Sequence, residues 1–343
     1  MAPTPRRPPR RRAALWLVSL LLIPAGLLAL GAAYQSAAAA NARRTLPPPG
    51  QLVDLGGYRL HLNCTGRAAP GQSTVILEGG LGASALVWTL VQPGLAAHTR
   101  VCSYDRAGMG WSDASPQART AAPLMAELHA LLAQAGEAPP YVLVGHAYGG
   151  VLGRVFAARY PDEVAGLVLV DARHEDFFER MPAAYLQADQ DNLRRARWLR
   201  LSTPFGLTRL AGQLGQLGAF ERLYAPLPEQ AARAAWELGV YSPPHWAATV
   251  AEREASPESY ALVRTTALPA HLPIIVLTAE HGSEAWQTGT PDTAAEAIWL
   301  DLQAQLAALS DNSQWLTVAG SGHYIYFDQP AAVVDAALSL AAP

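Results

Sequence analysis

The chain has 343 residues, of which 50% are hydrophobic, and a formal net charge of −3. This length and composition suit one substantial domain with an insertion and exclude a largely disordered chain. The basic residues cluster only at the N-terminus, so no nucleic-acid partner is expected. The sequence has no CxxC pair, no HExxH motif and no fixed repeat, so we expect neither a metal nor a cofactor.

The N-terminal segment, residues 1–44, has the pattern of a membrane anchor. Five arginines between Arg6 and Arg12 precede an apolar stretch from Ala13 to Tyr34, which is long enough to cross a bilayer as a helix. By the positive-inside rule the N-terminus lies in the cytoplasm and the remaining chain outside it, as in a single-pass protein of the cell membrane. The apolar run exceeds the roughly 7 to 15 residues of a signal peptide, which favours an uncleaved anchor. Small residues from Ala37 to Ala40 keep a cleaved signal peptide, and therefore secretion, as the alternative.

A proline-rich spacer at residues 45–50, TLPPPG, is expected to separate the anchor from a folded domain. Strand-like and helix-like segments then alternate along the chain. In order, they are a hairpin at Gln51–Gly66, a strand at Thr74–Leu77, a helix at Ala85–Ala97, a strand at Arg100–Tyr104, a helix at Ala121–Gln134, a strand from Tyr141, a helix at Val151–Tyr160 and a strand at Gly166–Val170. Apolar strands alternating with helices predict an α/β fold with a mainly parallel sheet that is covered on both faces.

The segment YVLVGHAYGG, from Tyr141 to Gly150, breaks from an apolar strand into a turn with glycines at positions 145 and 149. This is the spacing of a nucleophile elbow, Gly-x-nucleophile-x-Gly, in which a strained strand-to-helix turn presents the nucleophile. Here the central position is Ala147, whose methyl group can neither attack a carbonyl nor accept a proton. The sequence therefore predicts a catalytic frame that lacks its usual nucleophile.

Four blocks in this order resemble the α/β-hydrolase-fold family, of the serine hydrolase type with a cap domain. They are the glycine turn Gly79–Gly82, the segment DRAGMGWSD at Asp105–Asp113, the elbow, and the late GSGHY at Gly320–Tyr324. The resemblance covers roughly residues 51–341. It implies a core made of residues 51–171 and 273–343, with a helical cap at residues 172–272.

The resemblance implies an oxyanion hole built from backbone N–H groups of Gly80, with Leu81 beside it, and of Tyr148, the residue after the nucleophile position. Family members often have histidine where this chain has Glu78.

The same resemblance implies that His323 is the general base, because it follows the last predicted strand. Two carboxylates remain candidates for the acid that orients it. Asp171 directly follows GLVLV, as in some haloalkane dehalogenases, and is favoured; Glu280, after the strand Pro273–Leu277, is the alternative.

These features predict an enzyme that hydrolyses ester-like bonds of a small apolar molecule. In this sequence its catalysis is blocked, because Ala147 occupies the nucleophile position. Three explanations of Ala147 stay open: an engineered Ser→Ala variant, a noncatalytic ligand-binding or signalling protein, and chemistry that uses His323 and its acid without a covalent intermediate.

In this fold the strands that contain Cys64 and Cys102 are neighbours, which implies a disulfide between them; two buried free thiols are the alternative.

Overall fold

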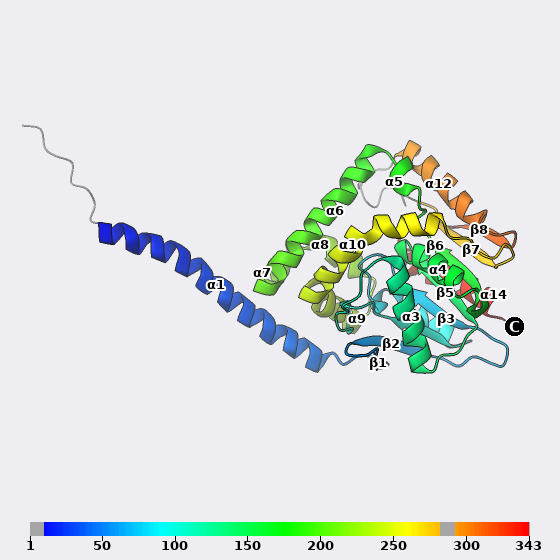
Figure 1. Ribbon diagram of the computed structural model, residues 1–343, viewed down its shortest axis with the longest axis horizontal. Coiled ribbons are helices and arrows are strands. Elements are labelled where there is room, and N and C mark those ends of the chain that lie inside the picture. The colour runs from blue at the N-terminus through cyan, green and yellow to red at the C-terminus, as the bar shows by residue number, and fades with distance from the viewer. Residues whose placement is uncertain (1–9, 282–291, 343) are drawn as a thin grey trace, which may run out of the picture.

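The computed structural model describes residues 10–281 and 292–342 and shows an eight-stranded sheet with helices on both faces (Figure 1). The strand order is β1-β2-β4-β3-β5-β6-β7-β8; β2 runs antiparallel to β1 and β4, and the other pairs are parallel. The predicted α/β-hydrolase fold with a mainly parallel sheet is confirmed. The strands are β1 (Gln51–Asp54), β2 (Arg59–Thr65), β3 (Thr74–Glu78), β4 (Val101–Tyr104), β5 (Tyr141–His146), β6 (Val164–Val170), β7 (Ile274–Ala279) and β8 (Ser313–Val318).

Two hydrophobic clusters lie on opposite faces of the sheet. Successive side chains of a strand point to opposite faces, so Ile76 of β3 joins one cluster while its neighbours Val75 and Leu77 join the other. The first cluster is covered by α3 (Ala121–Ala135) and α4 (Tyr148–Arg159). The second is covered by the one-turn η1 (Ala85–Trp88), α2 (Gln92–Ala96), α13 (Ile325–Asp328) and α14 (Pro330–Ala341). Strands buried on both sides explain the unbroken apolar runs of the sequence.

The segment between β6 and β7, which we call the cap from here on, is mainly helical. Its elements are α5 (Phe177–Arg180), α6 (Ala183–Ser202), η3 (Thr203–Phe205), α7 (Leu207–Gln213), α8 (Gly218–Tyr224), α9 (Glu229–Ala235), η4 (Trp236–Val240) and α10 (Pro243–Arg264). Helix α10 packs on the core, where the Ser259 hydroxyl accepts a bond from the backbone N–H of Ala121 and one from the Tyr148 hydroxyl. A further helix, α12 (Thr293–Ala307), lies between β7 and β8 in the chain.

Helix α1 (Arg10–Thr45) projects from the domain, but its C-terminal part is packed against it (Figure 1). Gln35 is buried, where its amide donates to the carbonyl of Tyr241 and its oxygen accepts from Arg209. Ala42 and Leu46 join the second hydrophobic cluster, which also includes residues of η1, α2, α9 and η4. The expected proline-rich spacer is also bound to the domain, because the Trp111 indole donates to the carbonyl of Leu46.

The predicted disulfide is present. Cys64 of β2 and Cys102 of β4 are direct partners in the antiparallel pair and are bonded to each other. The bond closes a loop with a sequence separation of 38 residues.

Replacing both cysteines with alanine should lower the free energy of unfolding by roughly 3 to 4 kcal/mol, because the unfolded chain then regains the entropy of that loop. Chemical unfolding of the purified full-length chain in detergent, with and without the substitutions, measures the difference. The unsubstituted chain under reducing conditions should match the double variant. Equal unfolding free energies for the native and doubly substituted chains would show that the crosslink contributes nothing.

Candidate active site

The elbow between β5 and α4 has the strained backbone expected of a nucleophile turn. Ala147 has φ 50° and ψ −114°, a conformation that a residue with a side chain rarely adopts. A Cβ on Gly145 would lie 2.5 Å from the Gly149 carbonyl oxygen, and one on Gly149 would lie 2.5 Å from the Glu78 carbonyl oxygen. Glycine is therefore required at both positions because backbone passes too close for any side chain.

His323 and Asp171 meet at the carboxyl ends of the strands. Nδ1 of His323 lies 2.7 Å from Oδ2 of Asp171, and Oδ1 of Asp171 accepts a 3.1 Å bond from the backbone N–H of Ala279. Asp171 is completely buried and, like Ala147, has a positive φ, of 42°. A proton on Nδ1 directed at the carboxylate makes Nε2 the proton-accepting nitrogen of the ring.

Glu280, the alternative acid, lies elsewhere. Its carboxylate is exposed, accepts a bond from the backbone N–H of Gly320 and pairs with His281 at 3.1 Å. The structure therefore brings His323 together with Asp171 and not with Glu280.

A cavity of about 150 Å³ lies over the elbow, and its walls include Ala147, His323 and the three residues expected to form the oxyanion hole, Gly80, Leu81 and Tyr148. A Cβ on Gly80 would lie 3.5 Å from that of Ala147, so the two turns face each other closely. Tyr148 is the first residue of α4, and an N–H at this position has no acceptor within its own helix. The position suits donation into the cavity.

A buried ion cluster supports the turn after β3. The guanidinium of Arg106 donates to the carbonyls of Gly79 and Gly80, the latter at 2.7 Å, and pairs with Glu78 and with Glu252 of α10. Burial raises the pKa of Glu78 above its ordinary value, and Arg106 opposes this shift. The Glu78 carboxylate thus holds the turn indirectly, through Arg106.

Residues 73–257 match the family described as alpha/beta hydrolase fold, which is more than half of the chain. The chain belongs to this family.

Relatives of this α/β-hydrolase-fold chain span several organisms. An uncharacterized protein of Schizosaccharomyces pombe is 28% identical over 316 residues, covering 82% of this chain and 53% of that protein. The chain thus spans about half the length of that relative. The uncharacterized protein YqjL of Bacillus subtilis is 25% identical over 257 residues, covering 75% of this chain and 79% of that protein.

Solved structures share the fold at low identity. A thermophilic esterase from Thermogutta terrifontis superimposes with a TM-score of 0.57 at 22% identity, covering 84% of this chain and 96% of that one. The enol-lactonase from Burkholderia xenovorans gives a TM-score of 0.55 at 17% identity, covering 84% and 99%. Identities this low establish the shared architecture alone.

His146, the residue directly before Ala147 in the elbow, also contributes to this α/β-hydrolase site, a role that its place in the motif did not indicate. Its Nε2 donates a 2.9 Å bond to the carbonyl of His323, and the two rings lie 4.6 Å apart. Burial, and then the neighbouring His323, lower the pKa of His146 well below its ordinary value, so its ring is neutral. His146 therefore fixes the backbone that carries His323.

Two guanidinium groups line the same cavity. Arg173 and Arg253 both approach Oδ1 of Asp189, at 3.8 and 2.7 Å. Burial lowers the pKa of Arg253 below its ordinary value; Asp189 opposes this lowering, and Arg173 adds to it. Within the described ranges, Nε of Arg253 is buried and has no hydrogen-bond partner. Two cations sharing one carboxylate leave this wall with an excess of positive charge.

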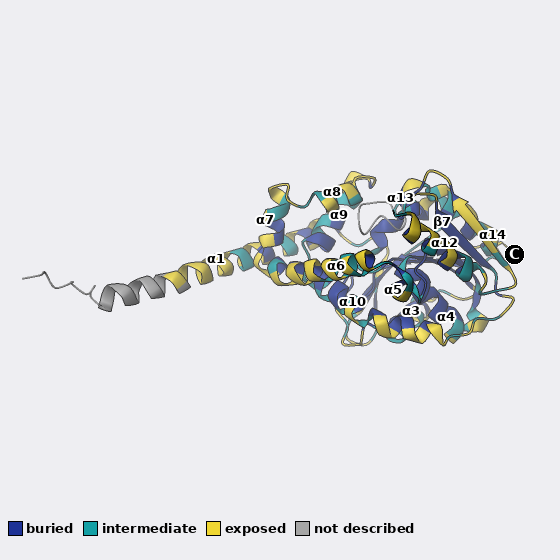
Figure 2. Cartoon of the chain, turned by 90° about the horizontal axis from the view of Figure 1, so that it is seen from above, coloured by how far each residue is buried: buried dark blue, intermediate teal, exposed yellow. Residues whose placement is uncertain are grey.

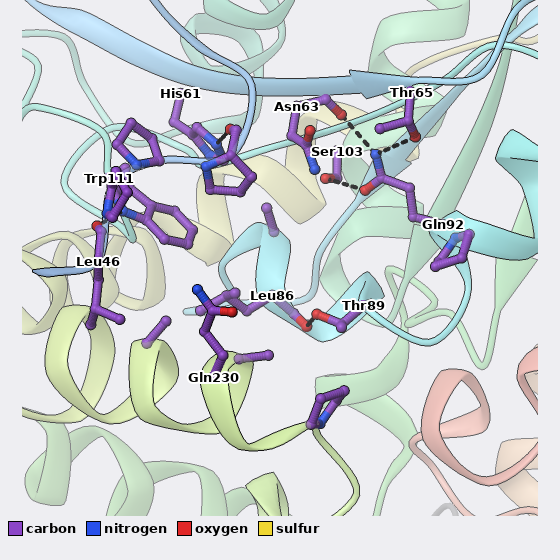
Figure 3. A pocket seen from close by; sticks show the side chains of 18 of the residues that line it. Leu46, His61, Asn63, Thr65, Leu86, Thr89, Gln92, Ser103, Trp111 and Gln230 are labelled. Atoms are coloured by element: carbon purple, nitrogen blue, oxygen red, sulfur yellow. Dashed lines mark hydrogen bonds between the residues drawn. The ribbon is translucent and has the colours of Figure 1, made fainter.

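A larger cavity, of about 690 Å³, lies between the spacer, β2, α2 and α9, and contains neither Ala147 nor His323 (Figure 3). Its polar groups bond to one another: the Gln92 amide donates to the Asn63 carbonyl and the Thr65 hydroxyl, and accepts from Ser103. The ring of His61 is held between the carboxylate of Asp105 and a backbone carbonyl of the spacer. Both ring nitrogens of His61 are engaged in these bonds, so neither is free to accept a proton from a hydroxyl that lines this cavity.

One group of potential metal ligands occurs in the residues that the structure describes, namely Cys64, Cys102 and Glu137. The two sulfur atoms are bonded to each other, whereas metals bind the thiolate form of cysteine. This cluster is therefore a disulfide beside a carboxylate.

Replacing Arg106 with methionine should lower the free energy of unfolding by about 3 to 5 kcal/mol, because Glu78 and Glu252 would remain buried without their cation. The matched control is Arg197→Met, since Arg197 forms an exposed pair with Glu254 and should change stability little. Urea unfolding of both variants in detergent makes the comparison. Similar losses in the two variants would show that the buried cluster does not support the fold in this way.

Proposed function

We propose that this chain binds a small ester-like molecule in the cavity over Ala147, at a Ser-His-Asp hydrolase site whose covalent step is blocked by alanine. The observation that carries the proposal is the strained Ala147 facing the same cavity as the His323–Asp171 pair. The family is one of hydrolases, which gives the expected class of chemistry, acyl transfer to water.

The roles follow from the geometry. A serine hydroxyl on the elbow would attack the ester carbonyl, Nε2 of His323 would take its proton, and Asp171 would stabilise the resulting imidazolium. Backbone N–H groups of Gly80 or Leu81, and of Tyr148, would bind the oxyanion. The proposed donors and the proposed base do not depend on the side chain at position 147, but a methyl group cannot form the acyl-enzyme. Loss of the serine alone costs about 10⁶-fold in a well-studied protease, so hydrolysis by this chain should be near background.

A noncatalytic ligand-binding protein is the second candidate, and Ala147 is the observation that favours it. The binding cavity and the oxyanion donors do not depend on a nucleophile. An engineered Ser→Ala variant would have the same structure and differ only in its origin.

Changing Ala147 to serine should create esterase activity on short activated esters, because the turn already holds this position in the strained conformation. Hydrolysis of an aryl ester by the purified native chain and the variant measures the gain, which we expect to be at least 100-fold over the native rate. The double variant Ala147→Ser/His323→Ala controls for contaminating esterases and should return to background.

A folded serine variant with no activity would contradict the hydrolase proposal and favour the binding protein. Native activity that His323→Ala abolishes would instead indicate direct activation of water by His323.

The excess positive charge at Arg173 and Arg253 bears on the ligand. The sequence predicted an apolar molecule, but a buried guanidinium with an unpaired N–H favours a neighbouring anion. We therefore propose that the ester-like ligand carries an anionic group at the end that faces these two arginines.

An aryl succinate monoester and an aryl butyrate form a matched pair, since the acyl chain of the succinate ends in a carboxylate and that of the butyrate ends in a methyl group. In the Ala147→Ser background, kcat/KM should be at least tenfold higher for the succinate, because a hydrogen bond to a charged group contributes about 1.5 to 3 kcal/mol. Arg253→Gln should remove this preference without lowering butyrate hydrolysis. Equal rates for the two esters would contradict an anion subsite.

We further propose that α1 is an uncleaved single-pass anchor with the hydrolase domain on the extracytoplasmic side. Within the described residues, Leu22–Thr45 is long and apolar enough to cross a membrane. Its last turns contact the domain through Gln35 and Ala42, so the crossing part is the N-terminal portion of α1. Cleavage near Ala37–Ala40 would remove Gln35 and its bonds to the cap, which supports an anchor over a cleaved signal. The disulfide suits an oxidising compartment.

A further inference from the structure

An exposed apolar surface lies on the cap at the junction of α6 and α7. We call it the cap edge, and its members are Trp198, Leu201, Phe205, Leu207, Leu210 and Leu214. Trp198 is 72% exposed, Leu214 63% and Leu210 50%. Six large apolar side chains exposed within 17 residues are unusual for a surface that faces only water.

The cap edge touches α1 where that helix leaves the domain. A Cβ on Gly31 would lie 2.2 Å from the carbonyl oxygen of Phe205, so the two backbones are in direct contact. On the N-terminal side of Gly31, the side chains of Leu22, Ile23 and Leu27 are exposed. Figure 1 shows α7 beside α1, and Figure 2 shows exposed residues along α1, α6 and α7.

The height of this contact matches the expected membrane boundary. About 20 helical residues cross the hydrocarbon core of a bilayer, and counting from Ala13, the first residue after the arginines, the crossing ends near Ala32. Gly31 therefore lies at the outer boundary, and the cap edge that touches it lies at the same height. Trp198 suits this position because tryptophan is enriched where hydrocarbon meets headgroups.

Charge on the same part of α6 fits an anionic lipid surface. Arg194, Arg195, Arg197 and Arg200 are all exposed. Arg194 and Arg197 pair with carboxylates, whereas Arg195 and Arg200 form no ion pair within the part of the chain that the structure describes. A helix with arginines beside exposed apolar residues is typical of a segment lying in the membrane interface. A symmetric contact between two copies would bring these arginines together, which disfavours a second chain as the occupant.

We propose that the cap edge is seated in the outer boundary of the bilayer that α1 crosses, with its leucines in the acyl region and its arginines among anionic headgroups. The domain is then held to the membrane at two places, and the cap is one of them. This inference rests on the proposed anchor and goes beyond it.

The experiment uses the full-length chain in nanodiscs of phosphatidylcholine and phosphatidylglycerol. The sequence contains only the two disulfide-bonded cysteines, so an introduced cysteine can be labelled alone with an environment-sensitive nitrobenzoxadiazole dye. Three variants are compared: Leu210→Cys on the cap edge, Ile23→Cys on α1, and Gln134→Cys, which is exposed at the C-terminal end of α3. The measurement is quenching by lipids with a spin label on the acyl chain.

The dye at position 210 should be quenched at least threefold more than the dye at position 134 and should emit at a shorter wavelength. Quenching at 23 but not at 210 would overturn the seated cap while leaving the anchor intact. No quenching at 23 would refute the anchor, and the seated cap with it. A blue-shifted dye at 210 that lipid does not quench would show that protein covers the cap edge, and this too would overturn the proposal.

Discussion

The close approach of two backbone turns is the constraint on which the site depends. The elbow after β5 packs against the turn after β3 so tightly that Gly149 can carry no side chain, and the N–H of Ala147 bonds to the carbonyl of Val170 on β6. The parallel sheet brings these strand ends to one edge, so the contacts between the two turns help to order both of them. Strain at Ala147 is one cost of this packing, and the surrounding sheet and helices sustain it.

Structural features that depend on residues close together in the sequence could be predicted from it. The glycines at 145 and 149 identify the elbow because only glycine fits there, and apolar runs of about five residues identify the buried strands. The pairing of Cys64 with Cys102 followed from strand order in the family. The choice between Asp171 and Glu280 depended on an analogy, because both follow a strand of the same sheet.

Contacts between distant residues that the family resemblance does not imply could not be predicted, since each partner looks ordinary alone. Arg106 and Glu252 are 146 positions apart, and nothing near either one indicates a buried pair that joins core and cap. The two arginines over the elbow come from opposite ends of the cap segment. The role of His146 also left no local pattern, because its bond to the carbonyl of His323 spans 177 positions.

The packing of α1 has a mechanical consequence. Gln35 and Thr45 bond this helix to the cap, whereas Leu46, the residue directly after it, is bonded to Trp111 of the core, so the end of α1 bridges the two layers. A cap that swung open over the cavity would have to rotate α1 or release one of its ends. With α1 as the proposed membrane anchor, access of ligand to the cavity would be coupled to the tilt of α1, and bilayer thickness, which helps to set that tilt, would become a control on entry.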